Sequence, residues 1–276
     1  MVISRLTNGF GNNLFQCVAG KILSEHHGVP HYFFPESEEY QCTKFLEELG
    51  FKKFKGKEIK NSVFVNENDY SFAFKNDYKD FNIILSGYFE DYRYFKPNRD
   101  FIKNWFPDVE NKNKNDLVFH FRTGDRLFYK NEFNSKPSPD KIKKAIDSFK
   151  FDRLYIVTDM YDWKRHTPDS LSNLKFHIKV DASKSVCNKT AVDYFNNCFD
   201  MLSDYKPIVR NKNVLEDFNF IRSFDKILFQ HGTMSWWAAF LSNASKVGVY
   251  GPWRPWKGTS NKNLSNIYLP GWFKWE

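Results

Sequence analysis

Apolar and polar positions follow one another in blocks that fit short strands and amphipathic helices. Residues 2–6 (VISRL) predict a short strand. After the turn TNGFGNN, apolar residues recur three and four positions apart, which predicts a helix from Asn12. Gly28 and Pro30 are expected to end that helix. The same rhythm predicts strands at 31–34 and within 81–89, a helical segment within 36–60 and a helix near 95–105.

A polar, charged stretch without periodicity, residues 107–116, interrupts this rhythm and is the predicted domain boundary. Beyond it the pattern predicts strands at 117–121, 153–158, 176–180, 226–230 and 246–250, and helices at 138–149, 190–204 and 233–242. Strands that alternate with helices form parallel sheets covered on both faces. The predicted fold is therefore α/β, with two Rossmann-like domains at 1–112 and 113–276.

Composition supports a well-packed chain. Its 276 residues suit one large domain or two ordinary ones, and 41% are hydrophobic, with 30 Phe, 14 Tyr and 8 Trp. Large aromatic side chains bury much surface each, so a core is available despite a mean hydropathy of −0.61. These numbers exclude an intrinsically disordered chain.

Charge and cysteine usage narrow the class of protein. The net charge of +8 suits a phosphorylated small substrate, nucleic acid or an anionic membrane surface, and scattered surface lysines explain it equally well. None of the four cysteines forms a Cys-x-x-Cys pair or has histidines at ligand spacing, which argues against a zinc site and fits a reducing, cytoplasmic location. The sequence has no signal-peptide pattern and no run of 18 apolar residues, so no integral membrane segment is predicted. Peripheral membrane association stays open.

The segment VFHFRTGDRL (118–127) places an arginine where a buried strand is expected to end. Ligands of open parallel sheets bind beyond the carboxyl ends of the strands, and the Arg122 guanidinium is a planar fork suited to phosphate oxygens. Gly124 allows a sharp turn or close approach of a ligand. Asp125 is suited to orient the arginine or accept a proton. A salt-bridged arginine that closes the strand is the structural alternative.

The segment LTNGFGNNLFQ (6–16) repeats the order of strand, glycine loop and helix. A helix N-terminus there, with Gly9, Gly11 and Asn12, would present N–H groups to an anion. Leu14 occupies the place of the third glycine of a dinucleotide fingerprint, so that fingerprint is excluded. A plain tight turn explains the two glycines equally well.

A third strand end lies in the segment 226–253, where His231 and Gly232 are expected to open a helix. Thr233 or Ser235 is expected to cap this helix beside an anion. A structural histidine is the alternative for His231, and the two tryptophans that follow are expected in the core. Because three strand ends carry glycine beside a polar or basic group, the sequence predicts a site for a phosphorylated ligand.

Four segments carry a resemblance to a known family. TNGFGNNLFQ resembles the Gly-x-Gly-Asn-Gln-x-Phe-Gln opening of family 11 glycosyltransferases, the α-1,2-fucosyltransferase group. ILSGYFEDYRYFKP is similar to their Gly-Tyr-Phe-Gln-Ser-x-x-Tyr-Phe segment, VFHFRTGDRL to their His-x-Arg-Arg-Gly-Asp motif, and LFQHGTMSWWAAFLS to their Ser-Thr-Phe-Ser-Trp-Trp-Ala-Ala helix. The matches follow the family's order between residue 7 and about residue 253.

The resemblance implies a GT-B architecture, in which the two domains face each other across a cleft. Domain 1–112 would lie on the acceptor side, and domain 113–276 would hold the nucleotide sugar. It also implies an inverting transfer of L-fucose from GDP-β-L-fucose to a galactose-type hydroxyl of an oligosaccharide, with no cofactor and no metal. The absence of any Asp-x-Asp from the sequence agrees with the metal-free expectation.

The resemblance assigns roles to individual residues. It assigns Arg122 to the leaving diphosphate and matches Asp125 to the acid of the motif. Because a carboxylate is suited to accept the proton of the acceptor hydroxyl, Asp125 is the first candidate for the general base, and Asp159, at the end of a predicted strand, is the second. Thr123 departs from the motif because it replaces a second arginine. The residues expected to bind the nucleotide sugar are Gly9, Gly11, Asn12, His120, Arg122, Gly124, His231, Gly232, Thr233 and Ser235.

Three alternatives remain at this level. The Thr123 departure favours the same fold with another nucleotide-sugar donor, and a carbohydrate-binding relative without activity is the second alternative. The third is a basic, aromatic-rich protein that binds RNA or single-stranded DNA. The chain lacks an arginine-rich or aromatic ladder motif, so no nucleic-acid partner is predicted.

Overall fold

The computed structural model describes residues 1–7, 9–36, 42–56, 58–123, 127, 136–158, 188–210, 212–251 and 264–276, and the statements below concern these residues. The chain divides into two compact units. Unit 1 comprises Met1–Asp108 and the described residues within 255–269, and unit 2 comprises the described residues of 109–251 with Pro270–Glu276. The acceptor and donor roles of the two predicted domains stay predictions.

Unit 1 contains a parallel sheet in which β1 is paired on both sides, in the order β2-β1-β4-β3. Its long helix α1 packs along β1 and β2 and ends at Gly28, whose φ of 65° lies in the left-handed region. The elements are β1 (Val2–Leu6), α1 (Phe10–His27), β2 (His31–Pro35), α2 (Thr43–Glu48), β3 (Ser62–Val65), α3 (Tyr70–Ala73), β4 (Asn82–Leu85), η1 (Tyr92–Tyr94), η2 (Lys96–Asn98), α4 (Arg99–Lys103) and η7 (Leu264–Ile267).

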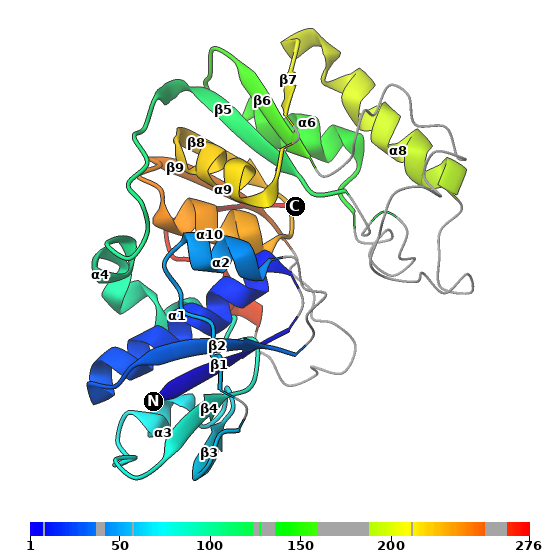
Figure 1. Ribbon diagram of the computed structural model, residues 1–276. Coiled ribbons are helices and arrows are strands. Elements are labelled where there is room, and N and C mark those ends of the chain that lie inside the picture. The colour runs from blue at the N-terminus through cyan, green and yellow to red at the C-terminus, as the bar shows by residue number, and fades with distance from the viewer. Residues whose placement is uncertain are drawn as a thin grey trace. The chain divides into compact units, whose positions relative to one another are not determined.

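Unit 2 contains a parallel sheet of six strands among the described residues, in the order β10-β9-β8-β5-β6-β7. The chain runs from β5 outward to β6 and β7, returns to β8 on the other side of β5, and continues to β9 and β10 (Figure 1). The elements are β5 (Asn113–Phe121), α6 (Pro139–Asp147), β6 (Leu154–Thr158), α8 (Asn188–Met201), η6 (Ser203–Tyr205), β7 (Ile208–Arg210), α9 (Val214–Arg222), β8 (Phe224–Phe229), α10 (Thr233–Leu241), β9 (Lys246–Tyr250) and β10 (Phe273–Trp275).

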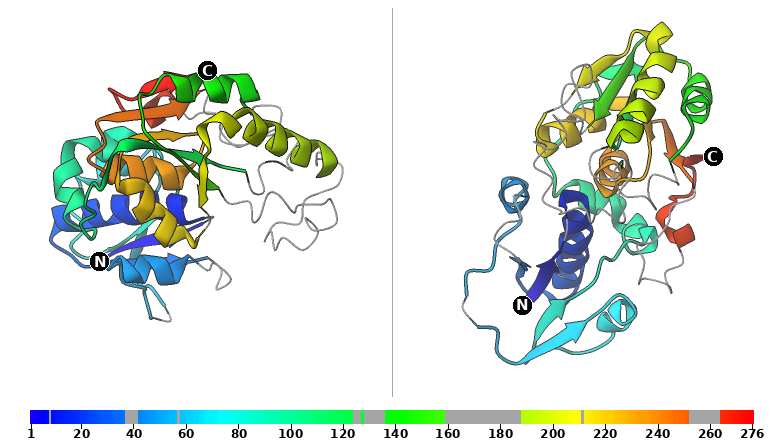
Figure 2. Two further views of the ribbon diagram at one scale, coloured as in Figure 1. Left: turned by 90° about the horizontal axis from the view of Figure 1, so that it is seen from above. Right: turned by 90° about the vertical axis from the view of Figure 1, so that its right-hand side faces the viewer.

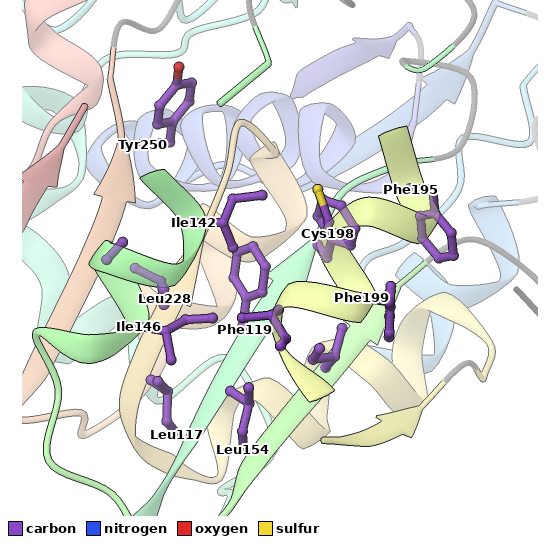
Figure 3. Close-up of a cluster of buried hydrophobic side chains, with 14 of the residues drawn as sticks. Leu117, Phe119, Ile142, Ile146, Leu154, Phe195, Cys198, Phe199, Leu228 and Tyr250 are labelled. Atoms are coloured by element: carbon purple, nitrogen blue, oxygen red, sulfur yellow. The ribbon is translucent and has the colours of Figure 1, made fainter. Parts of the chain in front are cut away.

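Helices cover both faces of this second sheet (Figure 2). On one face, α6 and α8 bury a cluster that includes Phe119 and Leu228 (Figure 3). On the other face, Tyr155 of β6 packs edge-on against Phe220 of α9, and α9 lies beside α10. Successive side chains of a strand point to opposite faces, so His120 of β5 points toward the α10 side.

The predicted fold class is confirmed, because the chain is α/β with two sheets of parallel strands. The predicted strands at 2–6, 31–34, 117–121, 153–158 and 246–250 correspond to β1, β2, β5, β6 and β9. The predicted strand at 176–180 lies outside the described residues. The cleft between domains stays a prediction. Among the described residues, no helix has both the length and the apolar character needed to cross a membrane.

Two predictions for unit 1 need correction. The helical segment expected within 36–60 is a single short helix, α2, because Gly50 with a φ of 88° follows its end. The helix expected near 95–105 is shorter and consists of η2 followed by α4. Apart from these two, the polar stretch 107–116, which was predicted as the domain boundary, contains the start of β5 at Asn113.

Candidate functional site

The candidate site lies at the carboxyl ends of β5 and β8, where the strand order reverses. β5 and β8 are direct neighbours, with His120 in register with Phe229, and the backbone N–H of Gln230 donates to the carbonyl of His120 over 3.4 Å. Ligands of doubly wound sheets bind in the crevice at such a point. The topology therefore brings together two sequence motifs that are more than a hundred residues apart.

A buried hydrogen bond joins the two motifs. His120 is only 3% exposed and Ser235 is fully buried, and the His120 Nδ1 is hydrogen-bonded to the Ser235 hydroxyl. This bond ties the first turn of α10 to the end of β5. The backbone N–H groups of such a first turn have no partner within their own helix and are suited to an anion.

The predicted side-chain cap of α10 is wrong. Gly232 occupies the N-cap position, and no side chain caps the helix. The Ser235 hydroxyl is used by His120 instead. The Gly232 backbone, with a φ of 173°, is extended and would accept any residue; a Cβ there would lie 3.4 Å from the Ser235 hydroxyl, an ordinary contact. Gly232 is itself buried, with the His120 ring and the Ser235 hydroxyl as its nearest neighbours.

Arg122 and Thr123 follow β5 directly. Arg122 is half-buried, and its carbonyl accepts a hydrogen bond from Lys136 Nζ over 2.9 Å. Thr123 is fully buried, and its hydroxyl bonds the hydroxyl of Thr158 at the end of β6 over 2.9 Å. Thr123, which departs from the motif of the family that the segment resembles, therefore packs between the ends of β5 and β6. Gly124, Asp125 and Asp159 lie outside the described residues.

His231 lies at the rim of the same edge. Its ring packs against Tyr250 at the end of β9, with 5.3 Å between ring centroids. Trp236 and Trp237 of α10 are fully buried, so the prediction that they belong to the core is confirmed. The ends of β5, β6, β8 and β9 thus contribute to one edge of the sheet of unit 2.

The glycine motif of unit 1 belongs to the other sheet. Gly9 is the N-cap of α1, and no side chain caps this helix. Its φ is −89°, and a Cβ added to Gly9 would have no atom within 4 Å, so neither backbone conformation nor packing requires glycine there. Gly11 and Asn12 lie in the first turn, the glycine buried and the asparagine half-buried.

Sequence reasoning missed the residue that organises this loop, Gln16. The Gln16 side chain donates to the Thr7 hydroxyl and to the carbonyl of Gly87, both over 2.9 Å. It accepts from the Thr7 N–H over 3.1 Å and from Asn13 Nδ2 over 3.2 Å. Polar residues three positions apart on the apolar face of a helix are the signal that would have identified Gln16 and Asn13.

The segment after β4 is held by a carboxylate that the motif does not include. Glu67 Oε1 accepts hydrogen bonds from the backbone N–H groups of Tyr88 and Phe89, the second over 2.9 Å. Gly87 has a φ of 156°, and a Cβ there would lie 2.8 Å from Glu67 Cγ. The glycine of this motif is therefore required by the close approach of Glu67.

Within the described ranges, no group of three or more His, Cys, Asp or Glu side chains is arranged to hold a metal ion. The metal-free expectation stays a prediction.

Comparison with known proteins gives likenesses among solved structures. No protein-family model matches the chain, and no curated protein matches it either. Among solved structures, the chain is similar to a mutant of Arabidopsis thaliana FUT1 in complex with GDP, at 9% sequence identity and a TM-score of 0.45. That similarity covers 91% of this chain and 70% of the other.

Proposed function

We propose that this chain is a glycosyltransferase that uses a nucleotide-sugar donor. In the specific form of the proposal, an inverting, metal-independent enzyme of the cytoplasm transfers L-fucose from GDP-β-L-fucose to a galactose-type hydroxyl of an oligosaccharide. Four segments that resemble family 11 glycosyltransferases in their order support it. The observation that carries it is the convergence of the third and fourth segments at the β5/β8 switch point through the His120–Ser235 hydrogen bond.

The chemistry requires stabilisation of a leaving diphosphate. As the sugar departs, negative charge grows on the phosphate, and donors fixed in advance lower the energy of that state. Arg122 and the first-turn N–H groups of α10 are the donors in this proposal. The His120–Ser235 bond keeps the two sets of donors in fixed relation, because it joins the end of β5 to the first turn of α10.

The acceptor hydroxyl needs a general base, and a carboxylate is suited to that task. Asp125 follows the end of β5 by four residues, and Asp159 directly follows β6. Phe121 and Thr158, the last residues of β5 and β6, are in register with each other. Both carboxylates therefore follow neighbouring strand ends, and we propose Asp125 as the base and Asp159 as the second candidate.

A different nucleotide-sugar donor is the second candidate function. The buried Thr123–Thr158 contact favours it, since the motif's second arginine has no counterpart at this position. Thermal shift with GDP, UDP, dTDP and CMP separates the two. A ligand at about 100 times its Kd stabilises the protein by roughly 2.7 kcal/mol, and stabilisation by GDP alone is the expected result.

The central test is an Arg122→Ala variant, assayed by release of nucleoside diphosphate from a panel of nucleotide sugars. We expect the rate to fall by a factor of at least about 10²–10³ while the circular dichroism spectrum is unchanged. Arg153→Ala is the matched control, because Arg153 precedes β6 at the opposite edge of the same sheet and pairs with Asp116. A near-normal rate for Arg122→Ala, or a rate that EDTA abolishes and Mn²⁺ restores, would refute the proposal.

A further inference from the structure

A lysine lies at the carboxyl end of β5, although no motif includes it. Lys136 Nζ donates to the carbonyl of Arg122 over 2.9 Å, which places the ammonium group at the backbone of the candidate phosphate-binding arginine. Lys136 is half-buried and lies fourteen residues beyond Arg122. Two cationic residues therefore meet at one strand end.

The neighbouring chain holds this lysine in place. The hydroxyl of Tyr194 in α8 donates to the carbonyl of Pro137 over 2.8 Å, so the residue after Lys136 is fixed to the helix that covers the sheet. Burial raises the pKa of the Cys198 thiol to about 12, while a hydrogen bond from Tyr194 and the positive charge of Lys136 act in the opposite direction. The Lys136 ammonium thus lies close to the α8 side of the sheet.

An unused polar group lies beside this cluster. Gln230, directly after β8, is 2% exposed, and neither its Nε2 nor its Oε1 has a hydrogen bond of normal geometry among the described residues. The side chain neighbours Tyr194, whose pKa is raised mainly by burial, while a loosely aligned side-chain hydrogen bond with Gln230 acts in the opposite direction. A buried carboxamide with no better hydrogen bond than this one is uncommon, and a bound ligand would supply the partners that such a group needs.

A diphosphate carries more than one negative charge, so a single guanidinium leaves it partly unneutralised in a partly buried site. Thr123, the residue next to Arg122, cannot contribute a charge and is fully buried against Thr158. We propose that Lys136 supplies the second positive charge for the donor diphosphate, from the α8 side of the strand end. This inference rests on the proposed nucleotide-sugar function.

The test is isothermal titration of the full chain with GDP, with inorganic pyrophosphate and with guanosine. Lys136→Gln keeps a donor for the Arg122 carbonyl but removes the charge, and Lys136→Arg keeps the charge. We expect Lys136→Gln to weaken binding of GDP and pyrophosphate by about 10- to 100-fold, as for loss of a charged hydrogen bond, and to leave guanosine binding unchanged. Lys136→Arg should stay within a few-fold of the wild-type affinity.

Lys246→Gln is the matched control. Lys246 also donates to a backbone carbonyl, that of Ser148 over 2.6 Å, but it opens β9 at the amino edge of the same sheet. Equal GDP affinity for Lys136→Gln and the wild type, or equal losses for GDP and guanosine, would overturn the assignment of Lys136 alone. A wild-type chain that binds neither GDP nor pyrophosphate would overturn the proposed function as well.

Discussion

Two buried glutamines, one fully hydrogen-bonded and one without partners of normal geometry, provide a matched test of the packing at the two sheets. Gln16 in unit 1 and Gln230 in unit 2 are 1% and 2% exposed. Leucine has a similar volume to glutamine and cannot form hydrogen bonds. The same substitution, Gln16→Leu and Gln230→Leu, therefore removes four hydrogen bonds in one place and none of normal geometry in the other.

The expected magnitudes differ in size and in sign. A buried hydrogen bond contributes about 0.5–1.5 kcal/mol net, so loss of the four bonds of Gln16 should lower the free energy of unfolding by about 2–6 kcal/mol. The Thr7 N–H and the Gly87 carbonyl lose a partner in that variant, which favours the upper part of this range. Gln230→Leu removes a buried carboxamide that has only a loosely aligned contact with Tyr194 among the described residues, and it should be neutral or stabilising by up to ~2 kcal/mol.

Urea unfolding followed by circular dichroism measures both effects, and each variant is compared with the wild type in the transition of its own unit. The midpoint should fall for Gln16→Leu and stay or rise for Gln230→Leu, with the dependence of the free energy on urea unchanged. Similar losses of stability in the two variants would refute the argument, because they would show that loss of the polar group, and not loss of its partners, sets the cost.

Two further predictions concern a departure from the motif and a half-buried histidine, His31. Thr123→Arg, which writes the family's second arginine into a fully buried position beside Thr158, should destabilise the protein by about 3 kcal/mol or more and bring no gain in transfer rate; a stable variant with tighter GDP binding would contradict this. For His31, burial and then the charge of Lys21 lower the pKa from 6.5 to about 3. The unfolded state therefore binds more protons in this window, and the free energy of unfolding should fall by up to ~1.4 kcal/mol per pH unit as the pH drops from 6.5 toward 3. His31→Gln should give a shallower pH dependence in urea unfolding from pH 7 to pH 4, and parallel curves for the two proteins would be the contrary result.

Apolar periodicity sufficed for the elements that bury one continuous face. Helix α1 and strands β1, β5 and β9 all have buried runs that the sequence displays directly. The short elements escaped prediction because packing against neighbours, and not their own pattern, defines them. β7 is an edge strand of three residues with two exposed apolar side chains, and within the described part of the chain β10 pairs with β9 alone.

Helix α9 shows that a usable signal was present and overlooked. Asn213 and Glu216 form a capping box, in which the side chain of each residue accepts a hydrogen bond from the backbone N–H of the other. Asparagine followed three residues later by glutamate, just before a hydrophobic run, is a sequence signature of a helix start. The three candidate strand ends, by contrast, were predicted from single residues. A glycine indicates a turn and an arginine a positive charge, and neither needs a long periodic pattern to be recognised.

The candidate site was predictable only on one of its two sides. His120, Gly232 and Ser235 belong to motifs, and parallel topology brings them together on the α10 side of the sheet. Lys136 and Tyr194 belong to no motif. Each is placed by a hydrogen bond to a backbone carbonyl, which every residue carries, so the sequence gives no sign of these contacts.

This asymmetry has a consequence for specificity. The α10 side contacts an anion mainly through backbone N–H groups, which every residue except proline carries, so it distinguishes charge more than chemical identity. The α8 side presents an ammonium group, a carboxamide and a hydroxyl on side chains that substitution can change while the motifs stay intact. Relatives with the same motifs and different residues at the positions of Lys136 and Gln230 should therefore differ in donor affinity. Lys136→Gln should reproduce such a difference, and an unchanged donor affinity in a double variant of Lys136 and Gln230 would contradict this.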